Sequence, residues 1–320
     1  MTVEKKLNFT MNAQRDAFRL KLALGLLNPF SRLNSSVRLG QLAWHVLSRW
    51  AIKPLPPKPP SGLHYLTIGG RAHWLMLRES LFSLYLSWKD LPLVTAVSDG
   101  SWSAEEFNPV FAWWPGIIEV LTREQVVAAT RAAGEEELGQ YATASPYGLK
   151  LAAIVHTARQ PQPMLFVDAD ILWFKDPAEI IGASESWGKP RGVQEGNCYQ
   201  RREIALRYCP QVMEPPFVNG GILALQGEFL ETGLLRRMVS EALADPKEGS
   251  FEQTIIATAV HKGAGFLPEK LCLVEFDDVH AFSQRNMVRE GYYSRHYVNW
   301  MRHLLYRDAL KLRWQHPSRP

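Results

Sequence analysis

A short apolar segment that ends in two acidic residues constrains this chain more than any other feature. Met164-Leu-Phe-Val167 has only apolar side chains, as a strand covered on both faces requires, and Asp168-Ala-Asp170 follows directly. Residues two apart on an extended chain point to the same side, so the carboxylates of Asp168 and Asp170 are expected to lie close together. Like charges held together need a cation, and carboxylate oxygens suit Mg²⁺ or Mn²⁺. We therefore predict a metal site beyond the carboxyl end of this strand.

The residues before this segment alternate between strand and helix patterns. The chain has 320 residues, 46% hydrophobic and 21% charged, which excludes a disordered or fibrous protein. The pattern predicts strands at 64–68 and 93–97, helices at 73–88 and 147–157, and a helix that begins with a capping box at Thr122. This succession predicts an α/β fold with a mainly parallel sheet.

Charge and proline content divide the chain. Residues 1–60 carry ten lysines and arginines against two acids, residues 61–288 carry nineteen against twenty-eight, and residues 289–320 carry seven against two. Five prolines between Pro54 and Pro60 exclude a helix or a central strand there and predict a stiff linker. The predicted parts are a basic amphipathic helical extension (1–53), the Pro-rich linker (54–60), the main domain (61–298) and a basic C-terminal helix or tail (299–320).

Targeting and redox features are few. No apolar run is long enough to cross a bilayer and no secretory signal precedes the domain, so a cytoplasmic location is the default expectation. The cysteines, Cys198, Cys209 and Cys272, form no C-x-x-C pair and are predicted to be free thiols. The acidic middle argues against nucleic-acid binding. The basic ends leave two interpretations open, a solvated surface or contact with an anionic membrane surface.

Three later motifs contain residues that could carry chemistry. Phe217-Val-Asn-Gly-Gly-Ile-Leu-Ala-Leu225 is a predicted strand, and its two glycines would weaken it unless another group approaches the backbone closely. Glu252-Gln253 precedes an apolar helix predicted at 254–261, and His296 lies in Arg295-His-Tyr-Val-Asn-Trp-Met-Arg302. Taken singly, a bulge, first-turn capping and a surface or core histidine would account for them.

Together, the motifs resemble the glycogenin and lipopolysaccharide galactosyltransferase-like family of retaining, metal-dependent glycosyltransferases. The resemblance spans about residues 63–302 and follows the order of the family's motifs. It implies the GT-A fold, a Rossmann-like, mixed but mainly parallel sheet flanked by helices. The motifs are Gly148-Leu-Lys-Leu151, Met164 to Asp170, Phe217 to Gly221, Glu252-Gln253 and His296 to Arg302.

The resemblance also implies roles for individual residues. The implied metal ligands are Asp168, Asp170 and His296, and the imidazole favours Mn²⁺ over Mg²⁺. The implied catalytic residues are Gln253, Lys150 and Asn219. The implied donor-binding residues are Thr67, Gly69, Arg71, Lys150, Asp168 and Arg302.

The chain departs from the family pattern at several positions. Asn299 and Arg302 replace the glycine and the lysine of the last motif, and Glu252 replaces an aspartate. Gly148 stands where relatives often have arginine, and the loop Thr67-Ile-Gly-Gly-Arg71 lacks the acid that relatives use around the nucleotide base. Arg302 keeps the positive charge that would bind a diphosphate.

The implied activity is transfer of a sugar from a nucleoside diphosphate sugar, with a UDP-sugar as the expected donor, to a hydroxyl of a glycan, glycolipid or protein, with retention. Residues 185–216 interrupt the strand and helix pattern and are predicted to form the acceptor wall. One alternative is a haloacid dehalogenase-like phosphohydrolase that uses Asp168 as nucleophile and Asp170 as acid/base, with Asp277-Asp278 as metal ligands. Another is a non-catalytic carbohydrate-binding protein on the same fold.

The membrane hypothesis is testable on the N-terminal extension. Replacing Arg15, Arg19 and Lys21 together by glutamine should lower binding to anionic vesicles about 100-fold, since each basic residue near such a surface contributes about 1 kcal/mol. Vesicle sedimentation measures this, with neutral vesicles as the control. Unchanged binding would remove the N-terminal proposal.

Overall fold

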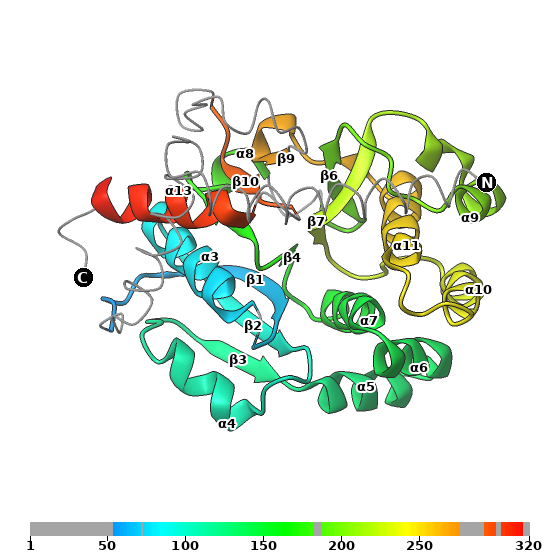
Figure 1. Ribbon diagram of the computed structural model, residues 1–320, viewed down its shortest axis with the longest axis horizontal. Helices are drawn as coiled ribbons and strands as arrows, with labels where there is room; N and C mark the ends of the chain where they lie inside the picture. Colours follow the sequence, from blue (N-terminus) through cyan, green and yellow to red (C-terminus); the bar gives the residue numbers. More distant parts are fainter. Residues whose placement is uncertain (1–53, 72, 182–186, 275–290, 299–301, 316–320) are drawn as a thin grey trace, which may run out of the picture.

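The computed structural model describes residues 54–71, 73–181, 187–274, 291–298 and 302–315 (Figure 1). A seven-stranded sheet lies at its centre. Its strands, in spatial order, are β3 (Ile118–Leu121), β2 (Leu91–Ser98), β1 (Pro60–Gly69), β4 (Met164–Val167), β7 (Phe217–Leu225), β6 (Arg191–Glu195) and β8 (Gly265–Phe266). Strands β3, β2, β1 and β4 are parallel, and β7 runs antiparallel to both β4 and β6. The predicted mixed, mainly parallel sheet is confirmed.

Side chains of each central strand alternate between two cores. Leu165 and Val167 of β4 belong to the core that includes residues of α3 (Trp74–Ser87) and α13 (Arg302–Gln315). Met164 and Phe166 belong to a second core on the other face. The helices of that core are α5 (Arg123–Ala132), α6 (Glu136–Ala144), α7 (Pro146–Ala158), α9 (Arg202–Tyr208), α10 (Thr232–Ala242) and α11 (Gly249–Lys262). The short helices are α4 (Ala104–Phe107), η1 (Asn108–Phe111), α8 (Ala178–Ile181), η3 (Pro210–Met213) and η4 (Glu269–Leu271).

A small second sheet follows the acidic motif. It consists of β5 (Ile171–Trp173), β10 (Ser294–His296) and β9 (Cys272–Val274), with β10 in the middle. Strand β10 is antiparallel to β5, and His296 pairs with Ile171, the residue directly after Asp170. Main-chain pairing therefore brings a late segment of the chain beside the acidic motif.

The Pro-rich segment lies against the domain. The amide of Leu55 donates to the carbonyl of Trp113 at 3.1 Å, and the Lys58 ammonium donates to the carbonyls of Tyr85 and Trp88. The expectation that 54–60 stays out of a central strand is wrong at its last residue, because Pro60 begins β1. A proline is tolerated there because β4 pairs only with residues 64–66 of β1, and the register is irregular between Pro60 and His64.

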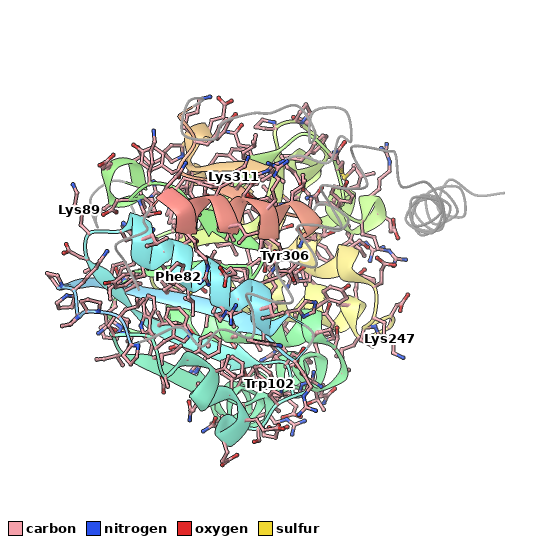
Figure 2. All side chains as sticks on the ribbon, turned by 60° about the vertical axis from the view of Figure 1, so that its left-hand side comes forward. Phe82, Lys89, Trp102, Lys247, Tyr306 and Lys311 are labelled. Atoms are coloured by element: carbon pink, nitrogen blue, oxygen red, sulfur yellow. The ribbon has the colours of Figure 1, made fainter. Side chains whose placement is uncertain are left out.

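The C-terminal helix packs on the main domain. Leu304, Leu305, Ala309 and Leu312 of α13 are buried in the core shared with α3. Figures 1 and 2 both show α13 lying along α3, with Phe82 labelled on α3 and Tyr306 on α13. No helix within the described part of the chain is both long and apolar enough to cross a bilayer.

Most local predictions agree with the structure. The capping box at Thr122 is present, and Cys198, Cys209 and Cys272 are free. Helix α11 begins at Gly249 rather than after Gln253, because the side chain of Glu248 caps it by accepting from the amide of Ser250. The extension 1–53, Asn299 and the pair Asp277-Asp278 lie outside the described residues.

The structure explains why Gly148 carries no side chain. A Cβ at Gly148 would lie 2.2 Å from the carbonyl oxygen of Tyr141 in the preceding helix. Gly148→Ala should therefore lower the free energy of unfolding by about 2 kcal/mol, since the backbones of α6 and α7 must separate. Urea denaturation checks this. Gly188→Ala, where a Cβ meets nothing within 4 Å, is the control, and an equal loss in both variants would contradict the packing argument.

Candidate active site and metal centre

The two acids of the Asp-x-Asp motif lie at the junction of the two sheets. The Asp168 amide donates to the carbonyl of Gly221 at 2.8 Å, and the Asp170 carbonyl accepts from the amide of Tyr297 at 2.9 Å. These main-chain bonds hold the turn between β4 and β5 from both sides. The side chain of Asp168 is about a quarter exposed, whereas that of Asp170 is almost fully buried.

His296 completes a cluster with these two acids. Its Nε2 atom lies 3.1 Å from Oδ1 of Asp170 and 3.8 Å from Oδ2 of Asp168. One ligand atom from each of the three residues lies within 4.8 Å of the others. The predicted association of Asp168, Asp170 and His296 is therefore present, with donors that suit a divalent cation.

A hydrogen-bond chain fixes the orientation of the His296 ring. Asn219 Nδ2 donates to Oε2 of Glu195 at 3.0 Å, and Asn219 Oδ1 accepts from the amide of Gly221 at 2.8 Å. The oxygen of the Asn219 amide is thus assigned by two partners. His296 Nδ1 lies 2.9 Å from that oxygen and must be the donor, so Nε2 is the ring atom that faces Asp170 and Asp168. A protonated Nε2 donates to Asp170, and a deprotonated Nε2 is available as a ligand atom.

The glycines of β7 make room for side chains from other segments. A Cβ at Gly221 would lie 2.5 Å from the His296 ring, and a Cβ at Gly220 would lie 3.0 Å from Oε1 of Gln253. The amide of Gly220 donates to that Gln253 oxygen at 3.2 Å. The expectation that another group approaches these glycines closely is confirmed.

Lys150 joins the Asp-x-Asp motif to the start of α11. Its ammonium lies 3.2 Å from Oδ1 of Asp168 and 3.1 Å from Oε1 of Glu252. Gln253 Nε2 donates to the other Glu252 oxygen at 2.8 Å. The structure therefore brings all three predicted catalytic residues, Lys150, Asn219 and Gln253, next to the Asp-Asp-His cluster or its immediate neighbours.

Negative charge exceeds positive charge in this region. Burial alone would lower the pKa of Lys150, but Asp168 and Glu252 outweigh burial and raise it, so Lys150 stays protonated. Burial raises the pKa of Glu252 while Lys150 opposes that shift. Burial lowers the pKa of His296, and Asp170 more than compensates. Asp168 and Asp170 thus stabilise positive charge on neighbouring side chains, and the same electrostatic attraction would favour a bound divalent ion.

Glu195 is a further buried acid near His296. The sequence predicts for it only a place in the acceptor wall, residues 185–216. It ends β6, and burial raises its pKa to about 7 although Asn219 and His296 oppose the shift. Its Oε1 atom has no hydrogen-bond partner among the described residues. The burial pattern of β6 does not alternate strictly, since the adjacent Gly192 and Val193 are both buried, so strand periodicity does not single out Glu195 in the sequence.

Of the predicted donor-binding residues, Lys150 and Asp168 lie at this cluster, whereas Thr67, Gly69 and Arg71 come from β1 and the loop after it. Thr67 and Gly69 end β1, whose carboxyl end shares an edge of the sheet with that of β4. Arg71 is exposed and its guanidinium pairs with Glu106. Arg302 is the first residue of α13, and its side chain lies outside what the structure describes.

The comparisons with known proteins give a fold. No family model and no curated protein matches the chain. The crystal structure of the galactosyltransferase LgtC, in complex with donor and acceptor sugar analogues, covers 79% of this chain and 95% of its own at a TM-score of 0.51 and 10% identity. The match to mouse xyloside xylosyltransferase 1 covers 75% of this chain and 98% of that one, with a TM-score of 0.45 and 14% identity. The match to GlyE of Streptococcus pneumoniae covers 82% of this chain and 65% of that one, with a TM-score of 0.47 and 11% identity.

The similarity to LgtC shows that the chain has the GT-A glycosyltransferase fold. The fold expected from the sequence motifs is thereby confirmed. An identity of 10% shows the fold alone.

The shifted acid Glu195 predicts a dependence of stability on pH. Its pKa is about 7 in the folded protein against 4.5 ordinarily, so the folded protein binds this proton more tightly than the unfolded chain. The contribution favours folding at low pH and is lost as pH rises through about 7. Relative to Glu195→Gln, which keeps an oxygen for Asn219, wild-type stability should fall by about 3 kcal/mol between pH 4.5 and 7.5.

Urea denaturation at several pH values measures this difference. Glu228→Gln, at an exposed position, is the matched control and should track the wild type. A wild-type curve parallel to that of Glu195→Gln would show that Glu195 titrates normally.

Proposed function

We propose that this protein is a metal-dependent glycosyltransferase that moves a sugar from a nucleoside diphosphate sugar to a hydroxyl of an acceptor. The observation that carries the proposal is the Asp168, Asp170 and His296 cluster, located beyond the carboxyl end of β4 in a GT-A fold. The solved LgtC structure holds donor and acceptor sugar analogues, which supports the same class of substrates here. The main domain is proposed to be residues 61–298.

The donor set fits a divalent cation. Asp168, Asp170 and His296 would hold Mn²⁺, or Mg²⁺, through two carboxylates and the Nε2 atom that the Asn219 contact leaves available. When bound, the ion would neutralise charge that develops on the diphosphate leaving group.

The chain's own residues organise the reaction around the cluster. Lys150 holds the carboxylates of Asp168 and Glu252 in fixed positions and supplies a permanent positive charge beside the leaving diphosphate. Gln253 is fixed by Gly220 and Glu252, so its amide presents one orientation to the donor sugar. Asn219 keeps the His296 ring in place.

The stereochemical part of the proposal is retention. Gln253 is expected near the anomeric carbon, and a carboxamide is a poor nucleophile, so we infer front-face attack without a committed covalent intermediate. UDP-sugars are the proposed donors. The nucleotide would be bound by Thr67, Gly69 and Arg71 at the end of β1, and its diphosphate by Arg302.

The acceptor is proposed to be a glycan, glycolipid or protein, bound against residues 185–216. Arg201 in this segment lies over the ring of Phe251 from α11, at 4.5 Å from the centroid. A peripheral position on an anionic membrane would suit a glycolipid acceptor. Because the apolar residues of α13 are buried in the core, such contact would use the basic extension 1–53 or the charged face of α13.

Thermal unfolding with sugar nucleotides tests the proposal. Mn²⁺ with the correct donor should raise the stability of the wild type by about 2.7 kcal/mol at a hundredfold excess over the dissociation constant. Asp170→Asn, which keeps the shape of the side chain but removes its charge, should lose most of this stabilisation. Asp90→Asn, an exposed acid distant from the motif in sequence, is the matched control.

The outcome decides between the alternatives. A shift that requires Mn²⁺, a nucleoside diphosphate sugar and Asp170 together supports the donor site and identifies the sugar. Absence of any shift with the whole donor panel would contradict the proposal. Hydrolysis of phosphate esters that depends on Asp168 would then favour the phosphohydrolase, and binding of glycans without donor would favour the non-catalytic alternative.

A further inference from the structure

Strand β10 presents its side chains alternately to the metal cluster and to the C-terminal helix. His296 faces Asp168 and Asp170, whereas its two neighbours contact Asp308 of α13. The hydroxyl of Tyr297 donates to Oδ2 of Asp308 at 2.8 Å, and Nη1 of Arg295 lies 3.5 Å from the same oxygen. One carboxylate oxygen therefore contacts the residues on both sides of His296.

These contacts are buried. Arg295 and Tyr297 are at most 2% exposed, and Asp308 is 8% exposed. Arg307 also binds Asp308, through Nε and Oδ1 at 2.9 Å, so both carboxylate oxygens have partners. Charged hydrogen bonds of this kind, held away from water, fix the geometry of the groups that make them.

Strand β10 is short and depends on such supports. It has three residues and is anchored at one edge by β5 and at the other by β9. Its main chain continues to Tyr297, whose amide donates to the Asp170 carbonyl. A shift of β10 by a fraction of an ångström would move the imidazole relative to both carboxylates, and a metal site tolerates little such displacement.

We propose that Asp308 is a positioning residue for the metal centre: by binding Arg295 and Tyr297, it couples the docking of α13 to the placement of His296. The inference rests on the metal site of the proposed function. It assigns α13 a role beyond covering the core. The helix would influence the Mn²⁺ affinity of the Asp168, Asp170 and His296 site, although none of its described side chains is a ligand there.

A second anchor of α13 provides a matched control. Arg313 forms two hydrogen bonds with Glu79 of α3, Nη2 to Oε1 at 2.6 Å and Nε to Oε2 at 3.1 Å, and its guanidinium lies 4.4 Å from the ring centroid of Phe82. Figure 2 shows Phe82 on the α3 segment along which α13 lies. This anchor stabilises the same helix through α3 rather than through β10.

The experiment compares Mn²⁺ affinity in three proteins by isothermal titration calorimetry. Asp308→Asn should weaken Mn²⁺ binding about 10-fold, the loss typical when a residue that orients a ligand is changed. Arg313→Gln should change the affinity less than twofold, even if both variants lower the melting temperature. Equal losses in the two variants, or none in Asp308→Asn, would overturn the proposal.

Two further measurements separate positioning from general destabilisation. In a His296→Ala background, Asp308→Asn should cause no additional loss of Mn²⁺ affinity, since its effect acts through His296. An undiminished loss there would contradict the proposal. In metal-free protein, hydrogen exchange at the Tyr297 amide should accelerate at least fivefold in Asp308→Asn and stay unchanged in Arg313→Gln.

Failure of the proposed function gives a different result from failure of this inference. Wild-type protein that binds no Mn²⁺ would contradict the metal site, whereas the exchange comparison would still decide whether Asp308 holds β10. Equal exchange at Tyr297 in the wild type and Asp308→Asn would overturn the positioning role even if Mn²⁺ binds.

Discussion

The organisation of this protein depends on the electrostatic cost of placing Asp168 and Asp170 side by side at the end of a buried strand. Asp170 is almost fully buried, so its charge must be balanced by protein groups or by an ion. Lys150 reaches Asp168 from α7, and His296 reaches both acids from a strand 126 residues beyond Asp170. The second sheet positions this histidine, because its middle strand, β10, contains His296 and pairs with β5, the strand that directly follows the acids.

The antiparallel direction of β7 places Asn219, Gly220 and Gly221 beside the acids at the end of β4. Because β7 runs antiparallel to β4, its amino-terminal half lies beside the carboxyl end of β4, where Gly221 binds the Asp168 amide and Asn219 binds His296. A parallel strand at this position would place its carboxyl end there instead. The same geometry crowds the edge, which is why Gly220 and Gly221 must leave space for Gln253 and His296.

The local part of this architecture was predictable from sequence, and the resemblance of its motifs to a known family predicted one long-range association, that of His296 with Asp168 and Asp170. The other long-range contacts were not predictable. The apolar run before Asp168, the Thr122 capping box and the paired glycines each report on their own neighbourhood, and the structure has all three. The contacts of Glu195 and Asp308 depend on partners 24 and 11 to 13 residues away that no period or motif identifies. Arg71 is a further example. The sequence predicts its place in the loop after β1, but the direction of its guanidinium depends on Glu106, which no local pattern identifies as its partner.

The chain from Glu195 through Asn219 to His296 also explains how an acid with a pKa near 7 can belong to a site without disturbing its histidine. Asn219 donates to Oε2 of Glu195 and needs only an acceptor there. Oε1 of Glu195 has no hydrogen-bond partner among the described residues. If the proton of the neutral acid resides on Oε1, then Oε2 is an acceptor in both ionisation states. The Asn219 oxygen then keeps facing Gly221 and His296, so the ring retains its Nδ1 proton. Glu195 can change charge at neutral pH while the ligand face of His296 stays the same, which separates the electrostatics of the pocket from the geometry of the metal centre.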